Sequence, residues 1–104
     1  MPSSTFHLAV VSDVDTAAQR FEAHDIDLGR RLIDDFEARI ILIEDFPYLG
    51  SELFEHYRHM MLQHFPYLVA YRIIDDIPQI LAVIDARRDP ETIRTLVGHR
   101  ATSA

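Results

Sequence analysis

The sequence contains no cysteine and no lysine, and it has no long apolar run. The missing cysteine excludes disulfides and thiolate chemistry. A membrane-spanning helix needs about 20 consecutive apolar residues, and no segment approaches that length. The first seven residues, Met1 to His7, have neither the basic nor the apolar region of a signal peptide. We therefore expect a cytoplasmic protein without a membrane-bound part.

The charge balance is acidic. All ten basic residues are arginine, and 17 carboxylates give a formal net charge of −7. General affinity for nucleic acid depends on cationic side chains that neutralise phosphates, so direct nucleic-acid binding is disfavoured. A local arginine patch can still bind an acidic partner, because local charges set the field that a partner meets.

The chain has 104 residues, of which 48% are hydrophobic. This fraction is typical of a globular protein and argues against disorder. The length suits one compact domain over residues 1–104.

The N-terminal part predicts a strand followed by a helix. Thr5–Val11 is rich in β-branched and aromatic residues, as strands are. Ser12 offers an N-cap with Asp15 three residues later, which predicts a helix over Asp13–His24. The apolar stripe of this helix is expected at Val14, Ala17, Ala18 and Phe21.

A second, longer helix is predicted over Gly29–Phe46, after a short link. Pro47 disfavours the helical conformation at the residue before it and so ends this helix. Ile41 and Leu42 fall off its apolar stripe, and they are either ordinary surface residues or contacts to a partner. The stripe itself consists of Leu32, Ile33, Phe36, Ile40 and Ile43.

Three strands are predicted next, over Tyr57–Phe65, Tyr67–Asp75 and Pro78–Asp85, after a loop that reaches about His56. Their short connections favour an antiparallel meander, with Asp75-Asp76 as a turn.

A last helix is predicted to begin at Pro90, capped by Asp89. It would cover Thr92–Val97, stop at Gly98, and leave His99–Ala104 loose. The order is then β-α-α-β-β-β-α, in the α+β class. Because each long helix has one apolar stripe, we expect the two-helix hairpin to pack on one face of a small, mainly antiparallel four-stranded sheet.

This order, in a chain this short, resembles the RelE/ParE toxin superfamily, and its ParE-like (plasmid stabilisation) branch fits better than the RelE branch. The resemblance covers nearly the whole chain. The short motifs that carry it are Leu28-Gly29 with Leu32, Phe46-Pro47, Tyr57-Arg58, the run from Phe65 to Ile73, the run from Ile80 to Ile84, and Arg87-Arg88-Asp89-Pro90.

The resemblance implies the toxin of a type II toxin–antitoxin module. Such a toxin acts by protein binding, inhibits DNA gyrase, and is neutralised by a ParD-like antitoxin whose disordered segment folds as it binds. An acidic toxin would need an antitoxin segment with more basic or apolar contacts than usual. Two alternatives stay open: a RelE-type ribosome-dependent mRNA endonuclease, and a non-toxic degenerate member of the family.

The chain departs from the family at Asp85. ParE-like relatives usually have a histidine at this position, just before the arginine-rich motif that begins here at Arg87. Cleavage of RNA by a ribose 2′-hydroxyl needs a base, an acid and cationic charge. Asp85 could in principle be that base, but a carboxylate beside an RNA phosphate is electrostatically unfavourable unless it is well paired. Asp85 therefore favours a toxin that binds over a ribonuclease, and we predict no catalytic residues.

Six residues are the candidate contacts to a target or antitoxin. Arg87 and Arg88 either grip an acidic group on a partner or pair with Asp85 and Asp89, leaving Arg88 solvated. Arg58 and Arg72 are also candidates, and they either lie on an open sheet face or are structurally paired. The last two candidates are Tyr71, for which core packing is the favoured interpretation, and Asp85 itself.

We predict no metal site and no cofactor. His56, His59 and His64 have neither a cysteine nor a close carboxylate set beside them. The phosphate-binding loop, the serine-hydrolase elbow and the zinc-protease motif are all missing from the sequence.

Overall fold

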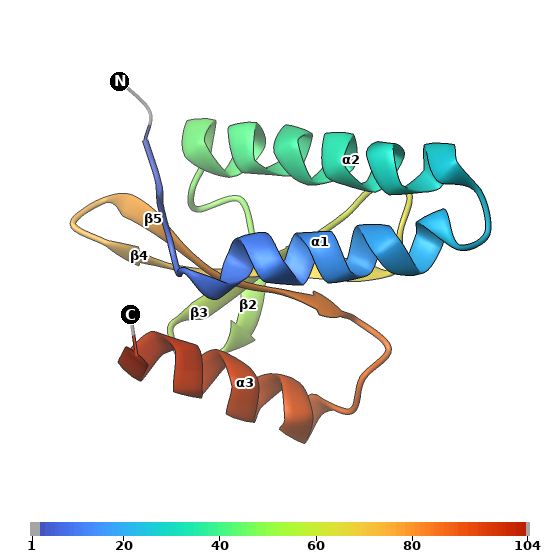
Figure 1. Cartoon of the computed structure of the whole chain (residues 1–104). Coiled ribbons are helices and arrows are strands. Elements are labelled where there is room, and N and C mark those ends of the chain that lie inside the picture. The colour runs from blue at the N-terminus through green and yellow to red at the C-terminus, as the bar shows by residue number, and fades with distance from the viewer. Residues whose placement is uncertain (1–2, 104) are drawn as a thin grey trace.

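The computed structural model describes residues 3–103, which form three helices and five strands (Figure 1). Within this range every helix falls short of the length and apolar character that crossing a bilayer requires. The elements in chain order are β1 (Thr5–Phe6), α1 (Ala9–Glu22), α2 (Ile26–Asp45), β2 (Ser51–Phe54), β3 (Tyr57–Met61), β4 (Tyr67–Ile74), β5 (Ile77–Asp85) and α3 (Pro90–Ser103).

The strands form one sheet in the order β1-β5-β4-β3-β2. The β2-β3-β4-β5 part is an antiparallel meander, as predicted, whereas β1 runs parallel to β5. The prediction of four strands was wrong, because Ser51–Phe54, in the segment predicted as a loop, forms β2. Three of its four residues pair with β3, with a register shift at Leu53, and a two-residue turn joins the strands, in which Glu55 has φ of 48°. The sheet is therefore five-stranded and mixed.

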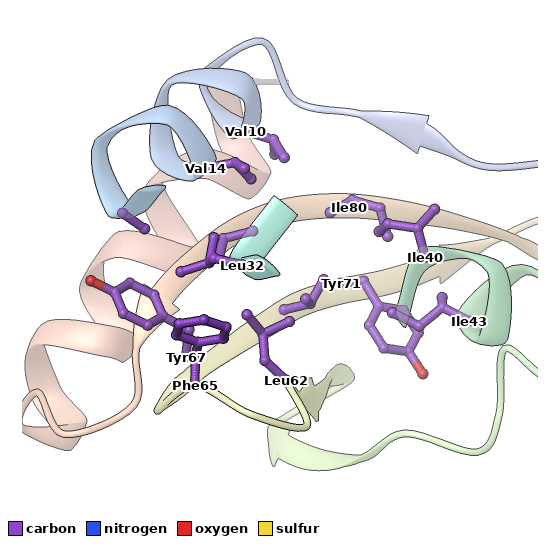
Figure 2. Close-up of a cluster of buried hydrophobic side chains, with 13 residues drawn as sticks. Val10, Val14, Leu32, Ile40, Ile43, Leu62, Phe65, Tyr67, Tyr71 and Ile80 are labelled. Carbon is purple, nitrogen blue, oxygen red and sulfur yellow. The ribbon is translucent and has the colours of Figure 1, made fainter. Parts of the chain in front are cut away.

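The helices lie on both faces of the sheet. Figure 1 shows α1 and α2 side by side on one face, as the two apolar stripes predicted, and α3 on the other. The larger core lies under α1 and α2, where Leu32, Ile43 and Tyr71 are fully buried (Figure 2). A second core lies under α3 and includes Leu81 and Val97.

The predicted first strand is shorter than expected, because only Thr5–Phe6 is strand and Ala9–Val11 already belongs to α1. Val10 is 1% exposed and continues the buried stripe of α1 one turn before Val14. Ser12 therefore lies inside the helix and caps nothing. Instead, the ring nitrogen Nδ1 of His7 accepts a hydrogen bond from the backbone N–H of Ala9, at 3.0 Å. Such a short apolar run suits a strand or a buried helix turn equally well.

The predicted link between the first two helices is shorter too. Asp25 caps α2, since its carboxylate accepts from the backbone N–H of Asp27 at 2.9 Å, and Gly29 lies inside the helix. The predicted strand Tyr57–Phe65 also ends earlier than expected: β3 ends at Met61 rather than Phe65. The buried carboxylate of Asp35 in α2 accepts from the N–H groups of Gln63 and His64, which holds this segment as a loop.

Helix α3 begins at Pro90 as predicted, but it runs to Ser103 instead of stopping at Gly98. Ile93, Val97 and Ala101 recur every four residues and are all buried against the sheet. Glycine inside a helix costs about 1 kcal/mol relative to alanine, and this packing outweighs that cost. Residues 99–103 are therefore helical rather than loose, and Ala104 lies outside the described residues.

Candidate functional site

The turn that follows β5 is organised by one carboxylate. Asp85 ends β5 opposite Tyr67, the first residue of β4. Its oxygens accept two hydrogen bonds from the Arg87 guanidinium, at 3.0 and 2.8 Å, and one from the Arg87 backbone N–H, at 2.9 Å. This bidentate geometry is the strong form of a charge-assisted pair.

A third residue reaches this turn from helix α1. Arg20 donates to the buried Tyr67 hydroxyl at 3.2 Å and to Asp85 at 3.5 Å. The hydrogen bond from Arg87, helped by the charge of Arg20, lowers the pKa of Asp85 to about 2. Asp85 is thus an anion at physiological pH and a poor proton acceptor, since a general base works best with a pKa near the operating pH.

Arg88 and Asp89 complete the turn, and they do not pair with each other. Asp89 caps α3 by accepting from the backbone N–H of Glu91 at 3.0 Å, and its hydrogen bond from the Thr92 hydroxyl lowers its pKa. The Arg88 side chain is exposed and enters none of the ion pairs formed by residues 3–103. Of the two arginines, Arg87 is structurally paired, while Arg88 points its charge at solvent.

Arg58 and Tyr71 lie elsewhere, where they hold the segment between α2 and β2. Arg58 donates to the carbonyls of Tyr48 and Gly50, at 3.1 and 2.9 Å. The Tyr71 hydroxyl donates to the Pro47 carbonyl at 2.7 Å and accepts from the Gly50 N–H at 3.2 Å. Tyr71 is fully buried, and burial raises the pKa of its hydroxyl. The packing interpretation of Tyr71 is confirmed, and its side chain presents no surface to a partner.

Arg72 secures the end of α3. Its guanidinium donates to the Gln79 side chain at 2.6 Å and to the Ala101 carbonyl at 3.0 Å. Carbonyls in the last turn of a helix lack intrahelical partners, and a cation there also complements the helix dipole. Arg58 and Arg72 are therefore both structurally bonded, which is the pairing alternative that the sequence left open.

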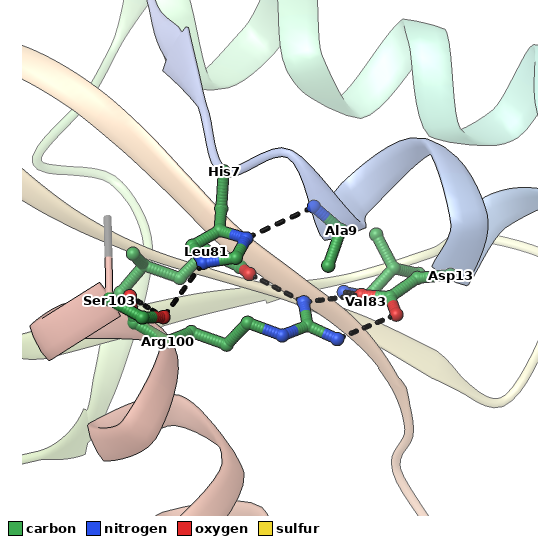
Figure 3. Close-up of polar contacts among 7 residues, drawn as sticks. All are labelled: His7, Ala9, Asp13, Leu81, Val83, Arg100 and Ser103. Atoms are coloured by element: carbon green, nitrogen blue, oxygen red, sulfur yellow. Dashed lines mark hydrogen bonds and ion pairs between the residues drawn. The ribbon is translucent and has the colours of Figure 1, made fainter.

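A second ion pair ties α1 to α3 across the edge of β5 (Figure 3). Arg100 donates to both oxygens of Asp13, at 2.8 and 2.9 Å, and to the Leu81 carbonyl at 2.8 Å. Asp13 also accepts from the Val83 N–H at 3.0 Å. Strand β1 pairs with β5 only at Gln79 and Ile80. Beyond Ile80, on that edge of β5, the Asp13 and Arg100 side chains therefore bond backbone groups that have no partner strand.

The six candidate residues thus fall into three places instead of one site. Asp85, Arg87 and Arg88 share the turn after β5, Arg58 and Tyr71 hold the segment before β2, and Arg72 holds the end of α3. Sequence reasoning missed Arg20, whose only signal was its position in the last turn of a predicted helix. Among residues 3–103, no three His, Cys, Asp or Glu side chains are grouped closely enough to hold a metal ion.

Comparison with known sequences agrees with this architecture. The sequence pattern of the family described as "ParE toxin of type II toxin-antitoxin system, parDE" matches residues 5–90, which is most of the chain. The chain belongs to the ParE toxin family. The match takes in the turn after β5 and ends at the first residue of α3.

Individual ParE relatives resemble parts of the chain. It is 38% identical over 58 residues to "Toxin ParE2" from two strains of Mycobacterium tuberculosis, CDC 1551 / Oshkosh and ATCC 25618 / H37Rv. That alignment covers 56% of this chain and 55% of the relative, so it spans about half the length of these toxins.

A solved structure shares the fold. The chain superposes on a chain of the "Chromosomal ParDE TA system from P. aeruginosa" with a TM-score of 0.73, covering 84% of this chain and 98% of that one. Sequence identity is 14%, so this likeness speaks for the fold alone.

Proposed function

We propose that this ParE family member is the toxin of a type II toxin–antitoxin module, formed by one domain over residues 1–104 and acting in the cytoplasm. It inhibits DNA gyrase by binding and is neutralised by a ParD-like antitoxin. The turn after β5, with Arg87 and Arg88, contacts the target.

The observation that carries the binding mechanism is the state of Asp85. Two arginines hold this carboxylate as an anion, with its pKa lowered to about 2. A ribonuclease needs a proton acceptor at its cleavage site. A carboxylate held in this way instead fixes the geometry of the arginines around it, as a rigid binding surface requires.

The distribution of charge also supports a binding role. Arg20, Arg87 and Arg88 lie at one end of the sheet, together with Asp85 and Asp89. The opposite end carries an open hollow of about 500 Å³ whose lining includes the carboxylates Glu52, Glu55, Asp75 and Asp76. The net charge of −7 is therefore unevenly spread, and the arginine end can attract an acidic surface that the whole chain would repel.

The test is a pair of assays with the purified chain. We expect it to inhibit DNA supercoiling by gyrase, and the neighbouring antitoxin to restore supercoiling. In a translating extract we expect no phased cleavage of messenger RNA. Cleavage in phase with codons, without inhibition of gyrase, would replace this proposal with the RelE-type endonuclease. Inactivity in both assays would support the degenerate, non-toxic alternative.

A further inference from the structure

The outer edge of β5 is covered along only part of its length. Strand β1 covers it at Gln79 and Ile80. The Asp13 and Arg100 side chains then bond it as far as the N–H of Val83 (Figure 3). The last residues of β5 lie beyond this ion pair, between α1 on one face of the sheet and α3 on the other (Figure 1). The C-terminal end of β5 is therefore a short strand edge without a neighbouring strand.

Two backbone groups at this edge point away from the sheet. Asp85 lies opposite Tyr67 of β4, whose C=O accepts from the Leu62 N–H at 2.9 Å and so points away from β5. Because these directions alternate along a strand, the backbone groups of Asp85 and Val83 point to the outer edge. The Val83 N–H bonds Asp13 there, and the Asp85 C=O accepts from the Arg88 N–H. Among the side-chain, turn and loop hydrogen bonds of residues 3–103, none uses the Val83 C=O or the Asp85 N–H.

A hollow of about 280 Å³ lies beside this edge, between α1 and α3. Its lining includes residues 83–85 at the end of β5. Thr16 and Arg20 line it from α1, and Leu96 lines it from α3. Arg88 lines it from the turn after β5. We call this feature the β5-edge hollow. Hydrogen bonds made inside such a partly enclosed site are stronger than those made in bulk water.

The β5-edge hollow has an excess of positive charge. Its two carboxylates, Asp13 and Asp85, are each held in a bidentate pair by an arginine. Two further guanidinium groups remain. Arg20 is 53% exposed and reaches Asp85 only at 3.5 Å, and Arg88 is exposed and outside the ion pairs of residues 3–103. In a chain of net charge −7, this local excess attracts an acidic ligand.

We infer that the β5-edge hollow binds a short, extended, acidic segment of the target protein, which pairs with the end of β5. The backbone of this segment donates to the Val83 C=O and accepts from the Asp85 N–H, and its carboxylate meets Arg20 and Arg88. Strand addition of this kind takes its affinity from backbone bonds and its specificity from neighbouring side chains. A free phosphate or a small carboxylate has no donor for the Val83 C=O. This inference rests on the proposed binding of DNA gyrase.

Residue-resolved hydrogen exchange of the full chain, free and bound to the gyrase holoenzyme, tests the pairing. We expect exchange of the Asp85 amide to slow about tenfold or more on binding, because this N–H gains an acceptor. The Ile84 amide is the internal control. It lies opposite Leu68 and points towards β4, so its exchange should change little.

Two tryptophan variants on α1 test the hollow itself. Thr16→Trp fills the hollow from an exposed position that lies outside the turn after β5. Gln19→Trp is the matched control, because Gln19 is exposed on the same helix and does not line the hollow. We expect Thr16→Trp to weaken gyrase binding about tenfold or more, and Gln19→Trp to bind as the unaltered chain does.

The outcomes separate this inference from the function on which it rests. If the unaltered chain binds gyrase, but Asp85 exchanges as before and Thr16→Trp binds as well as Gln19→Trp, the hollow is not the contact and the proposed function stands. If the unaltered chain does not bind gyrase, the proposed function itself fails. Slower exchange at Asp85 with the antitoxin, and not with gyrase, would assign the hollow to the antitoxin and overturn the inference.

Discussion

Asp13 and Arg100 are separated by 87 positions in the chain, yet their side chains form a bidentate ion pair at 2.8 and 2.9 Å. Both side chains are mostly buried, with 16% and 12% exposed. The pair joins α1 to α3 and bonds the edge of β5 between them, through Val83 and Leu81. It thus fixes the C-terminal helix to the same strand that carries Asp85.

Replacing Arg100 with alanine should lower the free energy of unfolding by about 2–3 kcal/mol, because it leaves Asp13 without its partner in a shielded site. Urea unfolding at neutral pH measures this change. Arg30→Ala is the control, since it breaks only the exposed pair with Asp27, at 3.2 Å, and should cost about 0.5 kcal/mol or less. Equal losses in both variants would show that the Asp13–Arg100 pair has no special role in stability.

Asp85 should make stability depend on pH in the acid range. Its pKa falls from 3.8 to about 2 on folding, so its contribution is full above the unfolded value and is lost as the pH drops towards 2. Because the Arg87 side chain is 66% exposed, this contribution is about 1 kcal/mol at most. Asp85→Asn should be less stable than the unaltered chain at neutral pH, and the difference should disappear near pH 2. A difference that does not change with pH would contradict the pairing.

Gly50 and Tyr71 should behave as a coupled pair. A Cβ atom at position 50 would collide with the Tyr71 hydroxyl. Gly50→Ala should therefore destabilise the fold by about 1–3 kcal/mol. Tyr71→Phe removes the bonds to Pro47 and Gly50 and should cost about 1–2 kcal/mol.

The double variant tests this coupling in the same unfolding assay. Without the hydroxyl the collision is smaller, so Gly50→Ala combined with Tyr71→Phe should cost less than the sum of the two single changes. Additive losses would mean that the two residues do not meet as described.

The helices and the central hairpin could be predicted because local sequence carries them. Residues close in the sequence determine the apolar stripe from Leu32 to Ile43. They also determine the Asp75-Asp76 turn, in which both residues have positive φ. The wrongly predicted element ends are set by residues that are distant in the sequence. β3 stops at Met61 because Asp35 binds the loop after it, and α3 continues past Gly98 because Val97 and Ala101 pack on the sheet.

The candidate site was predictable to a similar degree. Asp85 and Arg87 are two residues apart, so their pairing was among the sequence-based alternatives. Arg20 comes to the same carboxylate from a position 65 residues earlier, and nothing in the sequence indicates that approach.

Arg87 and Arg88 together should matter for inhibition of gyrase. Replacing both with alanine removes two guanidinium groups from the proposed contact and should raise the half-inhibitory concentration about tenfold or more. Arg30→Ala with Arg31→Ala is the matched control, because it removes two exposed arginines from α2. Both proteins should first be shown to be folded by circular dichroism. Equal inhibition by the two double variants would remove the turn after β5 from the target contact.

Growth after induction of this chain in cells that lack the antitoxin tests the central claim most directly. The account predicts growth arrest that the neighbouring antitoxin gene relieves, and an arrest that Arg87→Ala with Arg88→Ala weakens at equal protein level. Normal growth of cells that accumulate the folded chain would contradict it.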